Sequence, residues 1–214
     1  MIHALMRYRW SPRSFAPRAV APEMLRAIFE AARWAPSSFN EQPWRFLVAT
    51  RDEPDWLRRL QDYLDPRNGW ARTAPVLVAT AYRTRSPKTN ERSRVAQRDL
   101  GAAEQNMFLQ ATALGLAFHQ LAGFDHERLQ RTLLPPGFEP GTLIAIGYPC
   151  DADAISVTHP PAEATARSRL PLADFVFRDE WGVAAPFAAT IDRPAPDARS
   201  GGARVTQPRH LCYE

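Results

Sequence analysis

Helical and strand patterns alternate through residues 22–147, and this alternation limits the fold more than any other feature of the chain. Apolar residues recur at helical spacing in three segments, 22–35, 53–64 and 99–114. Asp52 is placed to cap the second of these helices, and Asp125 to cap a further short one. Short apolar runs predict strands at 46–49, 75–82, 116–120 and 143–147. Such alternation indicates an α/β layered domain around one central sheet.

Length and composition agree with one folded domain. The 214 residues are 45% hydrophobic and 23% charged, which is enough for a sizeable core. No apolar run approaches the roughly 18 residues of a membrane span. The N-terminus also lacks the apolar stretch of a secretory signal. We therefore expect a cytoplasmic protein without a membrane partner.

The sequence predicts neither a metal site nor a nucleic-acid interface. Cys150 and Cys212 lie far apart, and no Cys or His stands at metal-ligand spacing, so two free thiols are expected. The net charge is +4, and Lys88 is the only lysine among the 27 basic residues. Basic residues gather in 83–98 without interleaved aromatic residues, a pattern that does not favour nucleic-acid binding.

The connector PSSFNEQPW, residues 36–44, holds many hydrogen-bonding groups in a stiff frame. Pro36 prevents the preceding helix from continuing beyond Ala35, and Pro43 restricts the other end. An ordinary helix-to-strand connection needs only a few polar residues. The connector is either a rigid recognition loop or a well-packed turn that satisfies its own backbone.

Two pairs of arginines could bind an anion. In RWSPRSF, Arg9 and Arg13 flank the hydroxyl of Ser11 on a segment that contains Pro12. Guanidinium groups beside a hydroxyl can offer charge-assisted hydrogen bonds to a phosphate. Arg167 and Arg169 form a second pair far along the chain. Each pair alone also fits solvated surface.

Taken together, these segments resemble the nitroreductase family of flavin enzymes. The resemblance runs from about residue 7 to residue 182 and rests on RWSPRSF, EAARWAPSSFNEQPWRF, QATALGLAFHQLAGFD, IAIGYP and RSRLPLADFVF in that order. It implies a central mixed sheet flanked by helices, in an intertwined homodimer that binds FMN at the subunit interface. Residues 1–182 would form the FMN-binding domain. The proline-containing tail, 183–214, would be disordered or would wrap the partner subunit.

The resemblance assigns roles to the basic residues. Arg9 and Ser11 match the positions that hold the FMN phosphate, and Trp10 contributes backbone between them. Arg13 matches a cation at the flavin pyrimidine edge. The distant pair, Arg167 and Arg169, matches residues that also approach the phosphate.

The resemblance also assigns the connector. Pro36, Ser37, Ser38 and Asn40 match a loop that reaches the flavin from the other subunit, and Gln42 lies nearby. A rigid loop of this kind would hydrogen-bond a flat heterocycle with little ordering cost.

Gly123 matches a position where the backbone passes close to flavin N5, and glycine permits close approach. One branch of the family carries Glu where this chain has Ala122, so the substrate positioning of that branch is not carried over. His119 could act as an acid or base, although a structural role is the favoured interpretation. No catalytic side chain is assigned.

The expected function is hydride transfer from NADH or NADPH through flavin N5 to a small organic acceptor, such as a nitroaromatic, a quinone or an enal. The cofactor carries this chemistry, so no catalytic triad is needed. The alternatives are a flavin-dependent dehalogenase or flavin-destructase with a lid supplied by 83–98, and a flavin-binding module without turnover. The basic loop 83–98 either attracts the phosphates of the nicotinamide donor or is solvated surface, and the surface interpretation is favoured.

Overall fold

The computed structural model describes residues 2–150 and 168–188. The described residues fall into two compact units, one that contains residues 2–150 and one that contains residues 168–188. The first unit carries the sheet and the helices that pack on it. The predicted boundary at residue 182 stays a prediction, and residues 189–214 of the expected tail lie outside the described residues.

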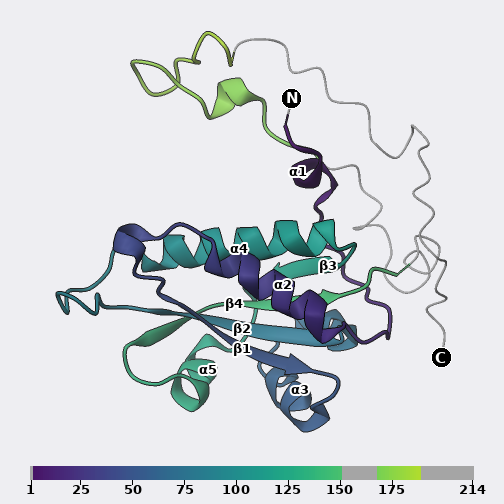
Figure 1. Ribbon diagram of the computed structural model, residues 1–214. Helices are drawn as coiled ribbons and strands as arrows, with labels where there is room; N and C mark the ends of the chain where they lie inside the picture. The colour runs from purple at the N-terminus through teal and green to yellow at the C-terminus, as the bar shows by residue number, and fades with distance from the viewer. Residues whose placement is uncertain (1, 151–167, 189–214) are drawn as a thin grey trace. The chain divides into compact units, whose positions relative to one another are not determined.

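A four-stranded sheet in the order β1-β2-β4-β3 forms the centre of the first unit (Figure 1). Its strands are β1 (Trp44–Thr50), β2 (Val76–Arg83), β3 (Ala117–Leu121) and β4 (Phe138–Gly147). The first six residues of β2 are all buried, because helices cover both faces of the sheet at this strand. Burial on both faces explains why β2 reads in the sequence as an unbroken apolar run.

The mixed sheet implied by the family resemblance is corrected for these four strands, whose three pairings are all antiparallel. β4 pairs with β2 on one side and with β3 on the other, so β2 and β3 run in the same direction. Helix α4 (Ala96–Ala113) makes the crossover between these two strands. The later insertion of β4 between them leaves every hydrogen-bonded pair antiparallel.

Helices pack on both faces of the sheet (Figure 1). On one face lie α2 (Pro22–Arg33) and α4, over a core that includes Ile28, Leu100, Met107 and Ile144. On the other face lie α3 (Pro54–Gln61), the 3-10 helix η2 (Pro66–Thr73) and α5 (His126–Leu133), over a core that includes Leu60, Leu77, Leu121 and Leu129. The α/β layered architecture is therefore confirmed.

Two helix starts test the capping predictions. The Asp125 side chain accepts a hydrogen bond from the backbone N–H of Arg128 at 2.9 Å, so the predicted cap of α5 is confirmed. The predicted cap of α3 is wrong. Glu53, and not Asp52, precedes the helix, and it makes no side-chain capping bond. The reason is Pro54, whose fixed φ suits the first helical position and sets the start one residue later.

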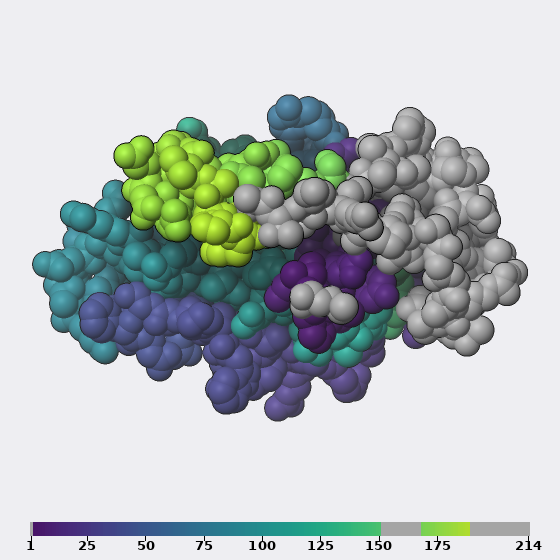
Figure 2. All heavy atoms as spheres, turned by 90° about the horizontal axis from the view of Figure 1, so that it is seen from above, coloured from purple at the N-terminus to yellow at the C-terminus, as the bar shows by residue number. Residues whose placement is uncertain are grey.

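The short helix α1 (Ala4–Tyr8) is not indicated by the sequence pattern, and none of its residues is buried. Its atoms, dark purple in Figure 2, lie at the surface of the face shown there. The second unit, within 168–188, holds the 3-10 helix η3 (Leu172–Asp174) and a bridge between Phe177 and Ala184. None of the helices in the described part of the chain combines the length and apolar character needed to cross a membrane.

Candidate functional site

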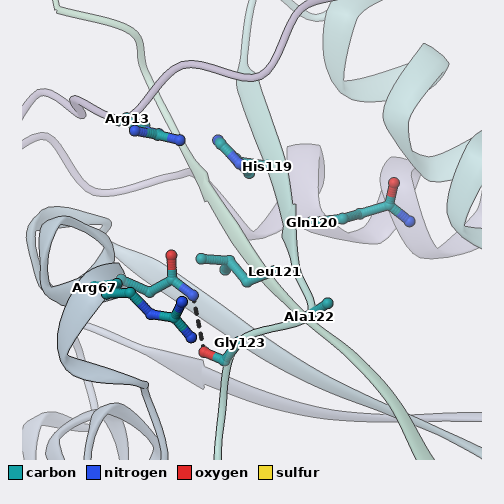
Figure 3. Close-up of a pocket in the computed structure, with 8 residues that line it drawn as sticks. Arg13, Arg67, His119, Gln120, Leu121, Ala122 and Gly123 are labelled. Carbon is teal, nitrogen blue, oxygen red and sulfur yellow. Dashed lines mark hydrogen bonds between the residues drawn. The ribbon is translucent and has the colours of Figure 1, made fainter. Parts of the chain in front are cut away.

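A pocket of about 390 Å³ lies where three segments of the first unit meet (Figure 3). Arg13 comes from the segment between α1 and α2, and η2 contributes Arg67 and Asn68. The remaining lining residues are 119–123, at the end of β3. Two residues predicted from distant segments, Arg13 and Gly123, are thus brought into one pocket.

Gly123 packs closely against η2 at the edge of the pocket. Its carbonyl accepts hydrogen bonds from Asn68 Nδ2 at 2.8 Å, drawn as the dashed line in Figure 3, and from the backbone N–H of Asp65 at 3.1 Å. A Cβ atom at position 123 would stand only 2.6 Å from Asn68 Nδ2. The residue without a side chain is therefore the one that fits beside Asn68.

His119 lies next to Arg13 at the opposite side of the pocket from Gly123 (Figure 3). Its Nδ1 atom is 2.8 Å from the carbonyl oxygen of Pro12, and its ring centroid is 4.5 Å from that of Trp70. Burial lowers the pKa of His119, and the nearby charges of Arg13 and Arg9 act in the same direction, whereas backbone hydrogen bonds to Pro12 and Ser11 oppose the shift.

Arg9 and Ser11 lie on the same segment as Arg13 but do not line the pocket. Arg9 donates from Nη1 to the Ser11 hydroxyl at 3.4 Å, and its guanidinium carbon stands 4.5 Å from the ring centroid of Phe108 on α4. This cation–π contact orients the guanidinium against the longest helix. Trp10, between them, is half-buried.

The loop 36–42 is held by internal bonds and by α4. The Ser37 hydroxyl accepts from the backbone N–H of Gln42 at 3.0 Å, and Gln42 Nε2 donates to Asn40 Oδ1 at 3.2 Å. The buried carboxylate of Asp99 accepts from the backbone N–H of Ser38 at 2.9 Å. No residue of this loop lines the described pocket.

Backbone strain accompanies this order. Phe39, Asn40 and Gln42 have φ values of 50°, 56° and 46°, in the left-handed region that residues with a side chain rarely adopt. Such conformations cost of order 1–3 kcal/mol each and persist where neighbouring contacts impose them. Pro36 closes the preceding helix as expected, since α2 ends at Arg33.

Only one member of the predicted second arginine pair, Arg169, lies among the described residues. Arg167 lies outside the described residues. Arg169 belongs to the second unit, where it is exposed and donates from Nη1 to the carbonyl of Ser168 at 2.7 Å.

Sequence reasoning missed Arg67 and Asn68. Arg67 is exposed and pairs with Asp65, with 3.0 Å between Nε and Oδ1. The available signal was Asp65-Pro66, because an Asp cap followed by Pro at the first helical position marks a helix start. That signal would have placed a short helix between α3 and β2, with Asn68 within it.

A buried carboxyl on α4, that of Glu104, is hydrogen-bonded to Gln120, which lines the pocket. Glu104 accepts hydrogen bonds from the hydroxyl groups of Thr80 at 2.7 Å and Thr142 at 2.9 Å, and from Gln120 Nε2 at 2.7 Å. Burial raises the pKa of Glu104, although these three bonds oppose the shift. The group joins α4 to three strands of the sheet.

Comparison with known proteins identifies a family model and solved structures that are similar to this chain. The model of the nitroreductase family matches residues 6–65 and 51–148. A crystal structure described as an oxidoreductase containing FMN is 34% identical, has a TM-score of 0.77, and covers 85% of this chain and 93% of its own. A protein from Desulfovibrio desulfuricans, provisionally named a nitroreductase and solved in complex with FMN, is 31% identical with a TM-score of 0.63, and covers 83% of this chain and 95% of its own.

A sequence relative agrees with these structures. A protein from Archaeoglobus fulgidus, provisionally named an NADH dehydrogenase/NAD(P)H nitroreductase, is 28% identical over 149 residues, which are 67% of this chain and 82% of the relative. The family match spans more than half of the chain and includes both the segment that carries Arg9 to Arg13 and the strand end that carries Gly123. The chain belongs to the nitroreductase family.

Proposed function

We propose that this protein is an FMN-dependent oxidoreductase that takes hydride from NADH or NADPH and passes it to a small organic acceptor. The observation that carries the proposal is that Arg13 and Gly123 meet in one pocket. The segment of Arg13 also bears Arg9 and Ser11. Membership of the nitroreductase family and the FMN named for two similar structures support it.

The pocket and the adjoining segment 9–13 fit FMN. The pocket volume of about 390 Å³ falls within the usual range for ligand pockets, roughly 300–1,000 Å³. Arg9 and Ser11 provide a guanidinium and a hydroxyl, a donor set suited to a phosphate. At Gly123 a Cβ would collide with Asn68, so only glycine lets the end of β3 pack this closely against η2 at the pocket.

Each of these residues has a proposed role. Arg9 and Ser11 bind the phosphate, with Trp10 contributing backbone between them. Arg13 lies at the pyrimidine edge and stabilises negative charge there after reduction. Asn68 holds the strand end at Gly123 in place through the bond to its carbonyl.

When bound, FMN supplies the hydride chemistry, and the protein supplies binding, orientation and electrostatics. The arginines at the pocket do not act as proton donors or acceptors, because guanidinium groups stay charged at all accessible pH values. The lowered pKa of His119 keeps its ring neutral near neutral pH, so it adds no further positive charge beside Arg13.

The proposed assembly is a homodimer in which loop 36–42 reaches the partner's flavin. The loop that carries Ser37, Ser38 and Asn40 has strained backbone at Phe39, Asn40 and Gln42, and none of its residues lines the pocket of its own subunit, which supports a role toward another one. Large apolar side chains are exposed on the first unit, among them Trp34 at 73%, just before this loop, and Phe39 at 84%, within it. Apolar surface of this kind favours burial by a second copy.

Hydride transfer is tested by following NADH and NADPH oxidation at saturating FMN, with a nitroaromatic, a quinone and an enal offered as acceptors. Acceptor-dependent oxidation that falls in Arg9→Ala at limiting FMN, and recovers when FMN is raised to saturation, supports the proposal. Flavin binding without turnover for any donor and acceptor would instead identify a binding module. No feature of the described residues favours the dehalogenase or flavin-destructase alternative.

The assembly is tested separately by light scattering, which should give the mass of a dimer. Dilution to the monomer should release FMN, because loop 36–42 of the partner is then lost from the site. A monomer that retains its FMN would contradict the shared site.

A further inference from the structure

His119 joins two parts of the chain that carry proposed FMN contacts. It stands on β3 opposite Ala145 of β4, a position fixed by the sheet register. Its Nδ1 atom is 2.8 Å from the carbonyl oxygen of Pro12, the residue between Ser11 and Arg13. Since a carbonyl can only accept, the bond requires the proton on Nδ1.

The imidazole has a defined charge and orientation as well. Burial, together with the charges of Arg13 and Arg9, disfavours its protonated form. A neutral ring that donates to the Pro12 carbonyl carries its proton on Nδ1. The contact with Trp70 of η2, at 4.5 Å between ring centroids, fixes the plane of the ring.

The Pro12 carbonyl is a suitable point at which to hold this segment. Proline has no backbone N–H, so the carbonyl is its only polar backbone group. Farther along, the backbone N–H of Ala16 donates to the carbonyl of Tyr148 at 2.8 Å and anchors that end of the segment beside β4. His119 supplies the corresponding anchor between Ser11 and Arg13.

We propose that His119 is a positioning residue that fixes the Ser11–Arg13 segment against the end of β3 and thereby sets the affinity for the FMN phosphate. The inference rests on the proposed function. Without the bond, the Pro12 carbonyl has lost its partner and the segment can shift, which moves Ser11 away from the place at which it meets the phosphate. His119 itself is not required to touch the cofactor.

Two substitutions separate the hydrogen bond from the ring contact. His119→Phe keeps an aromatic ring against Trp70 and removes the donor. His119→Asn removes the ring and keeps an N–H donor close to the position of Nδ1. We expect the Phe variant to bind FMN about three- to tenfold more weakly than wild type, as the loss of one hydrogen bond implies. The Asn variant should bind FMN within about twofold of wild type although it melts at a lower temperature.

Riboflavin, which lacks the phosphate, provides the second readout. The Phe variant should lose less affinity for riboflavin than for FMN, because riboflavin keeps the pyrimidine edge that Arg13 meets but lacks the phosphate that Ser11 meets. Two-dimensional ¹H–¹⁵N spectra of the flavin-free protein at neutral pH should show His119 as the neutral tautomer protonated at Nδ1.

Equal loss of FMN affinity in the Phe and Asn variants, or equal loss of FMN and riboflavin in the Phe variant, would overturn the inference in favour of general packing. Protonation at Nε2 alone would overturn it as well. If wild-type protein binds no FMN, the proposed function itself fails and the inference falls with it. Failure of the proposed function is distinguishable from failure of the inference, since only the former is seen in the wild-type protein before any substitution is made.

Discussion

Replacing Gly123 with alanine would place a methyl group 2.6 Å from Asn68 Nδ2, closer than non-bonded atoms approach one another. The atom that must yield is the end of a side chain, so Asn68 should rotate away and lose its 2.8 Å bond to the Gly123 carbonyl. That carbonyl keeps its other donor, the backbone N–H of Asp65 at 3.1 Å. The displaced Asn68 side chain remains beside the pocket.

The two consequences differ in size. Losing the bond should cost about 0.5–1.5 kcal/mol of folding free energy. Alanine also restricts the unfolded chain, which stabilises the folded state by about 0.4–1 kcal/mol where the native φ suits alanine. This condition is met, since Gly123 is not among the glycines with positive φ. The net loss of stability should stay within about 1 kcal/mol, or about 2–4 °C in melting temperature. FMN affinity should fall about two- to tenfold, because the strand end at the pocket is no longer held.

Thermal melting and FMN titration of the same preparations measure both effects. Gly69→Ala is the matched control, since a Cβ at Gly69 meets nothing within 4 Å and the residue lies in the same short helix as Asn68. In an Asn68→Ala background, Gly123→Ala should no longer weaken FMN binding further, as a coupled pair requires. Equal FMN affinity in Gly123→Ala and Gly69→Ala, or additive losses in the double variant, would refute the reasoning.

Three further predictions test other parts of the account. Arg9→Ala should weaken the binding of oxidised and reduced FMN alike, about ten- to a hundredfold. Arg13→Ala should also lower the midpoint potential of the bound flavin, which a redox titration at saturating FMN measures. An unchanged potential would contradict the role of Arg13. Asp99→Ala should lower the free energy of unfolding by about 1–3 kcal/mol, because the backbone N–H of Ser38 loses its acceptor, and Asp99→Asn should cost less; equal losses in chemical denaturation would argue against the bond. Burial raises the pKa of Glu104 in the folded state, so folding favours the protonated carboxyl. The stability that this protonated group contributes is present below the unfolded-state pKa and is lost as pH rises through the folded-state pKa. Glu104→Gln should therefore gain stability relative to wild type as pH rises, and a difference that does not change with pH would exclude this linkage.

Much of the fold was predictable because its elements bury apolar residues at regular spacing. The helices α2 and α3 and the strand β2 follow from local patterns that the core then uses. α1 could not be predicted in this way, since none of its residues is buried. The antiparallel pairing of β4 with β2 and β3 was not predictable either, because β4 enters between those two strands and no local pattern records this.

The candidate site was predictable only in part, for a related reason. Arg13 and Gly123 were found through their place in family motifs, and the structure brings them to one pocket. Asn68 carries no motif, and its importance comes from the 2.8 Å bond to Gly123, a contact between distant segments. His119 likewise gained its interpretation from the Pro12 carbonyl, which sequence spacing alone cannot place beside it.

The most direct test of the central claim is the identity of the flavin that the protein binds. The purified protein, or protein reconstituted with excess flavin and then freed of unbound ligand, is denatured, and the released cofactor is separated and quantified. The account predicts FMN in a near-equimolar amount to the chain, with no FAD retained. A folded protein that takes up no FMN under saturating conditions would contradict it.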